Sequence, residues 1–170
     1  LSKNVQLEPL FHGGGQEDNL RSSTHAAELI FSMHSAFCQQ NDDLLKNSQQ
    51  VAQLKEALIQ RLKEKSSYYT LPFEEKDNSP YILGILVNGI SSDIVLRHLE
   101  MEGIIISSGS ACSSRVSGEK ENLTVLGIEA QDHKSFLRVS FSHENTIAEV
   151  GEFVLKLNHI MDELSSLRRK

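Results

Sequence analysis

The sequence predicts an α+β fold in which a small sheet packs under long helices. Three observations carry this prediction. Apolar residues repeat at helical spacing towards both ends of the chain, strand-like apolar segments lie between them, and 170 residues suffice for one domain with a docking arm. We divide the chain into a glycine loop with a helical arm, residues 1–40, and a domain over residues 41–170.

The first part of the chain reads as loop followed by helix. The run His12-Gly13-Gly14-Gly15 is too permissive for the interior of a helix or strand. We expect Ser23 or Thr24 to cap a helix that runs to about Gln40. The helical pattern restarts at Asn41-Asp42, and a second apolar stripe follows. That stripe consists of Leu44, Val51, Leu54, Leu58 and Leu62.

Short strands and two further helices make up the rest. The sequence predicts strands over residues 68–71, 81–88, 104–106 and 136–141, and a short helix near residues 123–126. A helix from Ser91 or Ser92 to Glu102 ends at Gly103. The last helix begins at Thr146, where the spacing to Glu149 is typical of a capping box. Its apolar stripe is Ile147, Val150, Val154, Leu157, Met161 and Leu164.

Composition limits the class of protein. Hydrophobic residues make up 39% of the chain and charged residues 24%, as in soluble globular domains, and the net charge of −6 argues against a nucleic-acid binder. No apolar run approaches the roughly 18 residues of a membrane span. The two cysteines and seven histidines show no metal-ligand spacing, so we expect no metal site and a reducing, cytoplasmic compartment. Without an initiator Met or signal peptide, the sequence looks like a piece of a longer polypeptide.

Cys112 is the first candidate for chemistry. It lies in Ser107-Ser-Gly-Ser-Ala-Cys-Ser-Ser114, a segment with almost no side-chain volume that directly follows an apolar strand. Such a segment cannot pack a core, so we expect an exposed loop that carries the thiol. A cysteine of ordinary pKa is only a few per cent thiolate at pH 7 and needs cationic or dipolar neighbours to react. The alternative, a small buried hydrophobe, fits Cys38 beside Phe37 better.

Arg138 and Thr24 are the candidates for binding anions. Arg138 lies mid-strand, opposite the apolar face, where a guanidinium can hold a carboxylate through two hydrogen bonds. Thr24 follows the glycine loop and Arg21 at an expected helix start, where free N–H groups and the helix dipole favour phosphate. On the pattern alone, a solvent-facing arginine and a glycine turn with a helix cap are the more common cases.

Four segments resemble, in this order, the C-terminal half of the pyridoxal-phosphate-dependent cysteine desulfurases, class V aminotransferases of fold type I. They are His12-Gly-Gly-Gly-Gln-Glu17, Leu20-Arg-Ser-Ser-Thr24, the small-residue segment Ser107–Ser114, and Leu137-Arg-Val-Ser140. The resemblance covers essentially the whole chain. It implies the C-terminal small domain of such an enzyme, with an N-terminal loop-helix arm.

The resemblance also implies roles for the candidate residues. Cys112 would take the sulfur atom of L-cysteine as a persulfide, release L-alanine and pass the sulfur to an acceptor protein for iron–sulfur cluster assembly or tRNA thiolation. Arg138 would clamp the substrate carboxylate. Thr24 would bind the phosphate of pyridoxal phosphate across the interface of a homodimer. No role for nucleic acid or membrane is implied.

The sequence departs from the family at several points. Ser23 stands where the family usually has Gly, and Ser142-His143 replaces a turn that more often contains Gly. The cofactor-binding Lys, its preceding Ser-His and the ring-stacking His belong to a large domain that precedes this segment in the family. We therefore expect the chain by itself to be inactive. The alternatives are a non-catalytic sulfur-carrying or dimerising module and a selenocysteine lyase-like enzyme.

Overall fold

The computed structural model describes residues 7–73, 78–108 and 123–168, with the backbone alone at 41–42 and 167–168. The chain divides into two compact units, Leu1–Leu44 and Leu45–Lys170. Its helices are α1 (Ala27–Lys63), α2 (Ser92–Met101), the 3-10 turn η1 (His133–Ser135) and α4 (Ile147–Arg168). Its strands are β1 (Tyr69–Thr70), β2 (Ile82–Val87), β3 (Ser107–Ser108) and β4 (Phe136–Ser140). The predicted α+β class is confirmed.

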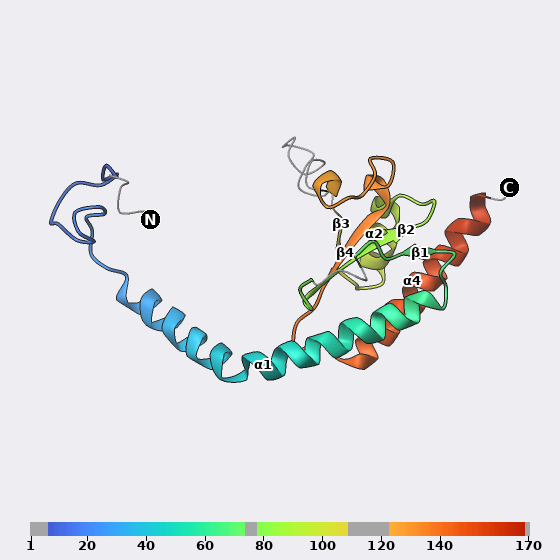
Figure 1. Cartoon of the computed structure of the whole chain (residues 1–170), viewed down its shortest axis with the longest axis horizontal. Helices are drawn as coiled ribbons and strands as arrows, with labels where there is room; N and C mark the ends of the chain where they lie inside the picture. Colours follow the sequence, from blue (N-terminus) through green and yellow to red (C-terminus); the bar gives the residue numbers. More distant parts are fainter. Residues whose placement is uncertain (1–6, 74–77, 109–122, 169–170) are drawn as a thin grey trace. The chain divides into compact units, whose positions relative to one another are not determined.

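The second unit is built on a four-stranded antiparallel sheet with the order β1-β2-β4-β3. In Figure 1, α4 and the C-terminal part of α1 lie side by side along this sheet. Alternate residues of the two central strands point towards the helices and are buried. These are Leu83, Ile85 and Val87 of β2 and Leu137 and Val139 of β4.

Both long helices are held to the sheet by the apolar stripes that the sequence shows. Val51 of α1 is fully buried. The other buried stripe residues of α1 and α4 belong to one core: Leu54, Leu58, Leu62, Val150, Val154, Leu157 and Met161. The predicted capping box at the start of α4 is confirmed, because Glu149 Oε2 accepts a 2.6 Å bond from Thr146 N–H and Thr146 Oγ1 accepts a 3.2 Å bond from Glu149 N–H. Within the described residues, none of the helices combines the length and apolarity needed to cross a membrane.

Three expectations about the elements are wrong. The helical arm and the following stripe form one continuous helix, α1, which begins at Ala27 and not at a Ser23 or Thr24 cap. The Ile104–Ile106 run is not a strand. Ile104 N–H bonds to Leu99 O at 2.8 Å and Gly103 N–H to Glu100 O at 3.0 Å, a Schellman end of α2. The chain is therefore still turning at Ile104, and strand pairing starts only at Ser107.

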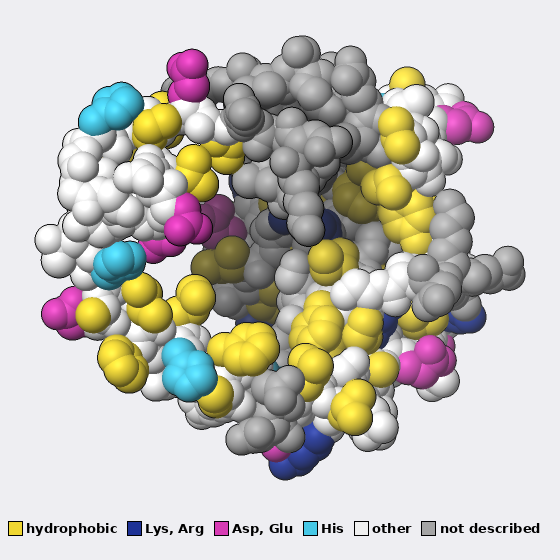
Figure 2. All heavy atoms as spheres, turned by 60° about the vertical axis from the view of Figure 1, so that its left-hand side comes forward, with side chains coloured by type: hydrophobic (Ala, Val, Ile, Leu, Met, Phe, Trp, Pro, Cys, Tyr) yellow, Lys and Arg dark blue, Asp and Glu magenta, His cyan; other side chains and the backbone are white. Residues whose placement is uncertain are grey.

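The third correction concerns the first half of α1. Cys38 is exposed and not a buried hydrophobe; its Sγ lies 3.7 Å from His34 Nε2 on the same helix. Within its own unit this segment has no core to cover, so its large apolar side chains are exposed. Figure 2 shows such side chains at the surface. In this unit they include Leu10, Phe11, Leu29, Phe31, Met33 and Phe37.

Candidate functional site

Arg138 lies at the centre of the sheet, on the face turned away from the helices. On β4 its neighbours Leu137 and Val139 are buried under the helices, whereas Arg138 itself is exposed. Its partners across the sheet are Gly84 on β2 and Ser107 on β3. No ion pair between described residues uses Arg138, so its guanidinium is available to a carboxylate ligand.

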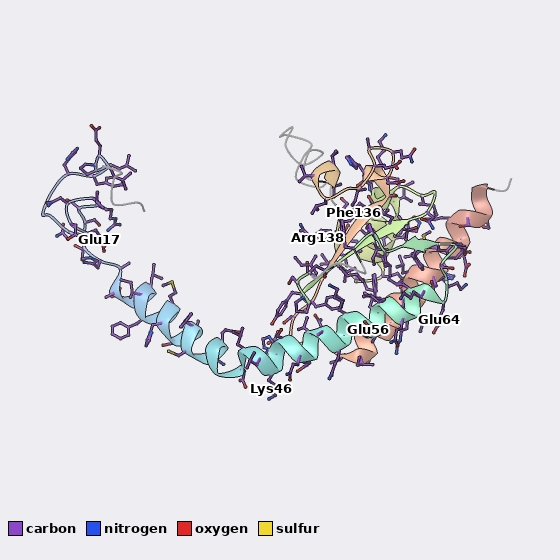
Figure 3. The ribbon with its side chains drawn as sticks, in the orientation of Figure 1. Glu17, Lys46, Glu56, Glu64, Phe136 and Arg138 are labelled. Carbon is purple, nitrogen blue, oxygen red and sulfur yellow. The ribbon has the colours of Figure 1, made fainter. Side chains whose placement is uncertain are left out.

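A small second apolar cluster fixes the strand beside Arg138. Phe136, labelled with Arg138 in Figure 3, packs with Leu86, Leu123 and Ile128 on the same face. Gly84 is needed here because a Cβ at this position would lie 2.8 Å from Phe136 Cε2. The sequence analysis did not assign Gly84 a role in the site. The sequence does contain a signal for this role, because a glycine inside an apolar strand pattern often marks a site of close packing.

The sheet brings the start of the cysteine segment next to Arg138. Ser107 pairs with Arg138 and Ser108 pairs with Leu137 in the antiparallel register of β3 and β4. Cys112 follows Ser108 by four positions in the sequence and lies outside the described residues. The strand that precedes the cysteine begins at Ser107, three residues later than predicted, and the placement of Cys112 stays a prediction.

Thr24 lies in the first unit, three residues before α1 begins, and is exposed. The loop before it is closed by a parallel bridge between Phe11 and Arg21 and by a 3.3 Å bond from Ser22 N–H to Phe11 O. The turn inside the loop takes left-handed backbone angles at Gly15 and at residues 17–19. The glycine run thus forms a compact loop that leads to the start of α1.

The start of α1, rather than the loop before it, has features that favour an anion. Thr24 offers an exposed hydroxyl just ahead of a long helix, whose first N–H groups and dipole favour an anion. Within the loop, Gln16 Oε1 is buried without a hydrogen-bond partner. As an acceptor it needs a donor, so it does not support the binding of a phosphate. The Glu17 carboxylate lies 2.8 Å from His25 Nε2, just ahead of α1. Its negative charge disfavours a second anion there. Elsewhere among the described residues, no three His, Cys, Asp or Glu side chains gather in a way that could hold a metal ion.

Most titratable groups with shifted pKa values lie on α4 and its contacts; the exception is Lys55 on α1, where partial burial lowers the pKa. The hydrogen bond from Thr146 N–H lowers the pKa of Glu149. The 2.5 Å bond donated by Tyr68 Oη lowers the pKa of Asp162, and burial raises the pKa of Tyr69, whose hydroxyl donates to Asn158 at 2.8 Å. These interactions tie the start of the sheet to α4 and support the fold, since none of them touches Arg138.

Comparison with known families matches residues 10–153 of this chain to the model described as Aminotransferase class-V. The chain belongs to the class V aminotransferase family. The matched range contains the glycine loop, the small-residue segment and the arginine strand.

Individual members of the class V aminotransferase family align with nearly the whole chain. A NifS/IcsS protein homolog of Lactobacillus delbrueckii subsp. bulgaricus is 30% identical over 95% of this chain and 42% of its own length. A putative cysteine desulfurase IscS 1 of Bacillus subtilis is 27% identical over 88% of this chain and 40% of its own. The solved structure of a NifS-like protein from Rickettsia africae superposes with a TM-score of 0.78 at 27% identity, over 94% of this chain and 41% of that one. The chain thus spans about two fifths of the length of these relatives.

Proposed function

We propose that this chain supplies the sulfur-accepting thiol and the carboxylate clamp of a pyridoxal-phosphate-dependent cysteine desulfurase. Cys112 is the sulfur acceptor, Arg138 binds the carboxylate of L-cysteine, and Thr24 binds the cofactor phosphate. The observation that carries the proposal is the pairing of Ser107 with Arg138. It anchors the cysteine segment one strand away from the clamp.

The protein's own groups have defined tasks in this reaction. Arg138, on a rigid central strand, orients the substrate through its carboxylate. The Cys112 thiolate attacks the substrate sulfur, so that an S–S bond forms while the bond between sulfur and the substrate β-carbon breaks. The electron pair of the broken bond stays on carbon, which is protonated to give alanine. One cysteine and one thiol become one alanine and one persulfide, and no external oxidant or reductant is required.

The proposal of pyridoxal phosphate as cofactor is supported by membership of the class V aminotransferase family and by the exposed Thr24 hydroxyl ahead of α1. Thr24 would hold its phosphate through the exposed hydroxyl. Pyridoxal phosphate, when bound, supplies an electron sink that weakens bonds at the substrate amino acid. The lysine that this family uses to bind it covalently lies outside the matched motifs, so a further polypeptide segment has to provide it.

The test of Cys112 uses a complete enzyme that contains this chain. Cys112→Ala is expected to abolish persulfide transfer from L-cysteine to an acceptor thiol, because it removes the proposed nucleophile. Cys38→Ala is the matched control, since it removes the other cysteine, which is exposed on α1, and is expected to leave transfer unchanged. Persulfide formation is measured by mass spectrometry and alanine release in parallel. Undiminished transfer by Cys112→Ala would refute the assignment.

The test of Arg138 separates binding from chemistry. Arg138→Ala is expected to raise the KM for L-cysteine roughly tenfold to a hundredfold, because a charge-assisted contact contributes about 1.5–3 kcal/mol. Arg97→Ala, on α2, is the control that removes an arginine elsewhere. Equal KM values for the two variants would show that Arg138 does not bind the substrate.

The competing function is a sulfur-carrying module without cofactor chemistry. It is compatible with a chain that spans about two fifths of the length of its relatives. The chain is mixed with pyridoxal phosphate and L-cysteine, and then with a persulfide donor. Cofactor absorbance with alanine release would show a self-sufficient enzyme. Neither signal, together with persulfide on Cys112 from the donor, would favour the carrier.

A further inference from the structure

The β3 edge of the sheet is open beyond its first two residue pairs. Among the described residues, β3 pairs with β4 only at Ser107–Arg138 and Ser108–Leu137, although the same register would place Ile105 opposite Ser140. No backbone hydrogen bond among the described residues joins Ile105 to Ser140. The Schellman end of α2 uses Ile104 N–H and turns the Ile104–Ile106 segment away from β4.

The free edge of β4 presents hydrogen-bonding groups to solvent. Phe141 N–H donates to Tyr81 O on the β2 side of the strand at 2.8 Å. Successive residues of a strand direct their N–H and C=O groups to opposite edges, so those of Ser140 face the open β3 side. Ser140 is exposed. The next N–H in this alternation, that of Ser142, donates to Asn145 Oδ1 at 2.7 Å, so an added extended segment would pair with β4 through Ser140.

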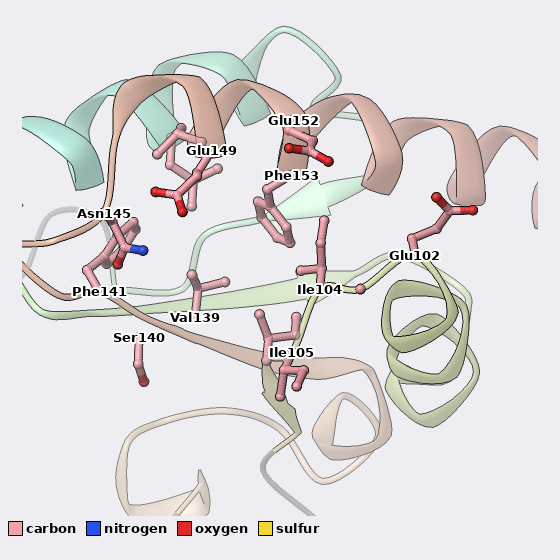
Figure 4. A pocket seen from close by; sticks show the side chains of 14 residues that line it. Glu102, Ile104, Ile105, Val139, Ser140, Phe141, Asn145, Glu149, Glu152 and Phe153 are labelled. Carbon is pink, nitrogen blue, oxygen red and sulfur yellow. The ribbon is translucent and has the colours of Figure 1, made fainter.

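A cavity of about 360 Å³ lies where Ile104–Ile106 and β4 separate, beneath the first turns of α4. Figure 4 shows its lining residues. Its floor is apolar and includes Leu58, Ile104, Val139, Val150 and Phe153. The volume lies within the range of sites that bind small molecules or single anchoring side chains. A large apolar side chain of a partner suits this floor.

The rim of the cavity is acidic. Glu102, Glu149 and Glu152 line it, and the lining residues include no lysine, arginine or histidine. Lys156 lies just outside, 2.8 Å from Glu152 Oε1 and 3.7 Å from Glu102 Oε2. Glu102 and Glu152 thus share one cation and Glu149 has none among the described residues, so the three carboxylates carry two uncompensated negative charges. Complementary lysines or arginines on a partner would be attracted here.

We propose that this edge docks an extended segment of a partner protein that adds to β4, inserts an apolar side chain into the cavity and places basic residues against the acidic rim. Side chains two positions apart lie on the same face of a strand, so the recognised pattern is a basic residue, an apolar residue and a basic residue at every second position. The docked segment would lie beside β3, whose last residue precedes Cys112 by four positions. The docking itself does not depend on the chemistry proposed for Cys112.

The test measures binding of a fluorescein-labelled peptide, Thr-Lys-Thr-Leu-Thr-Lys-Thr, by fluorescence polarisation. We expect it to bind the chain at least about tenfold more tightly than two matched peptides, because each removes one recognised feature. One has glutamate in place of both lysines, and the other has serine in place of leucine. Equal binding of the three peptides would overturn the proposal, and so would no detectable binding of the first.

Two variants of equal charge separate docking from general attraction to an acidic protein. Ile105→Lys changes an 87% exposed residue of the cavity lining, and Leu155→Lys changes a 73% exposed residue of α4 that does not line it. Ile105→Lys is expected to weaken binding of the leucine–lysine peptide about tenfold, and Leu155→Lys less than twofold. Similar losses in both variants would show that only net charge matters.

Hydrogen exchange tests the strand pairing directly. The amide of Ser140 is expected to exchange more slowly when the leucine–lysine peptide is bound, since the peptide backbone covers it. Unchanged exchange at Ser140 would refute strand addition. Sedimentation of the chain without peptide tests the other occupant, because a dimer that protects Ser140 and excludes the peptide would assign this edge to a second copy instead.

Discussion

Gly84 occupies a position where one added methyl group has a calculable effect. Its Cβ would lie 2.8 Å from Phe136 Cε2, 3.0 Å from Phe136 Cζ and 3.1 Å from Phe73 Cδ2. The two rings already contact edge to face, with centroids 6.4 Å apart, and Phe136 is buried. Neither ring can move without disturbing the cluster that supports the strand of Arg138.

Two opposing effects decide the stability of Gly84→Ala. Alanine restricts the unfolded chain and by itself stabilises a protein by about 0.4–1 kcal/mol. Overpacking a filled site costs about 1–3 kcal/mol. Because a contact of 2.8 Å is too short to be relieved by small shifts, we expect overpacking to dominate, with a net loss of about 1–2 kcal/mol and a melting temperature lower by several degrees.

The assay is urea unfolding followed by far-UV circular dichroism, since the chain has no tryptophan. The variant Phe136→Leu shortens the obstructing ring. If the clash is the cause, Gly84→Ala should cost at least about 1 kcal/mol less in the Phe136→Leu background than in the original chain. A Gly84→Ala chain as stable as the parent, or strictly additive costs in the double variant, would refute the reasoning.

Three further predictions concern α4. Leu157 has 0% exposure, and Leu157→Ala should lower the free energy of unfolding by about 2–5 kcal/mol. Leu155 on the same helix has 73% exposure, and Leu155→Ala should change this free energy by less than about 0.5 kcal/mol. Urea unfolding of both variants measures the difference. Removing the cap by Thr146→Ala should cost about 1 kcal/mol in the same assay. The capping bond lowers the pKa of Glu149, so its stabilisation is complete above the ordinary value of 4.5 and is lost as the pH falls through the folded value. Glu149→Gln should therefore reduce the acid sensitivity of unfolding as the pH falls below about 4.5, and an unchanged pH profile would contradict this role.

The sequence predicted the elements whose signals are local. The stripe from Val51 to Leu62, the alternation along residues 136–141 and the capping box at Thr146 each depend on neighbouring residues alone, and the structure contains all three. The position of Arg138 on the face opposite Leu137 follows from the same alternation.

The errors arose where a distant or competing interaction decides the structure. Three isoleucines have high strand propensity, but the Schellman end of α2 holds Ile104 and delays pairing to Ser107. Cysteine is a residue type that is often buried, but Cys38 is exposed. Among the described residues of its own unit, no buried apolar residues are present to pack against it. The cavity under α4 forms where Ile104–Ile106 and β4 separate. This separation of two distant segments cannot be predicted from residue spacing.

The strand order of the sheet affects how the chain is made. β4 lies between β2 and β3, so the central pairing joins residues 82–86 to residues 136–140. During biosynthesis, the apolar β2 segment is complete more than fifty residues before the strand that covers its edge. Pairing over such a sequence separation is slow, and a newly made chain exposes this segment meanwhile. Assembly of the sheet in the cell is therefore governed by the arrival of Phe136–Ser140.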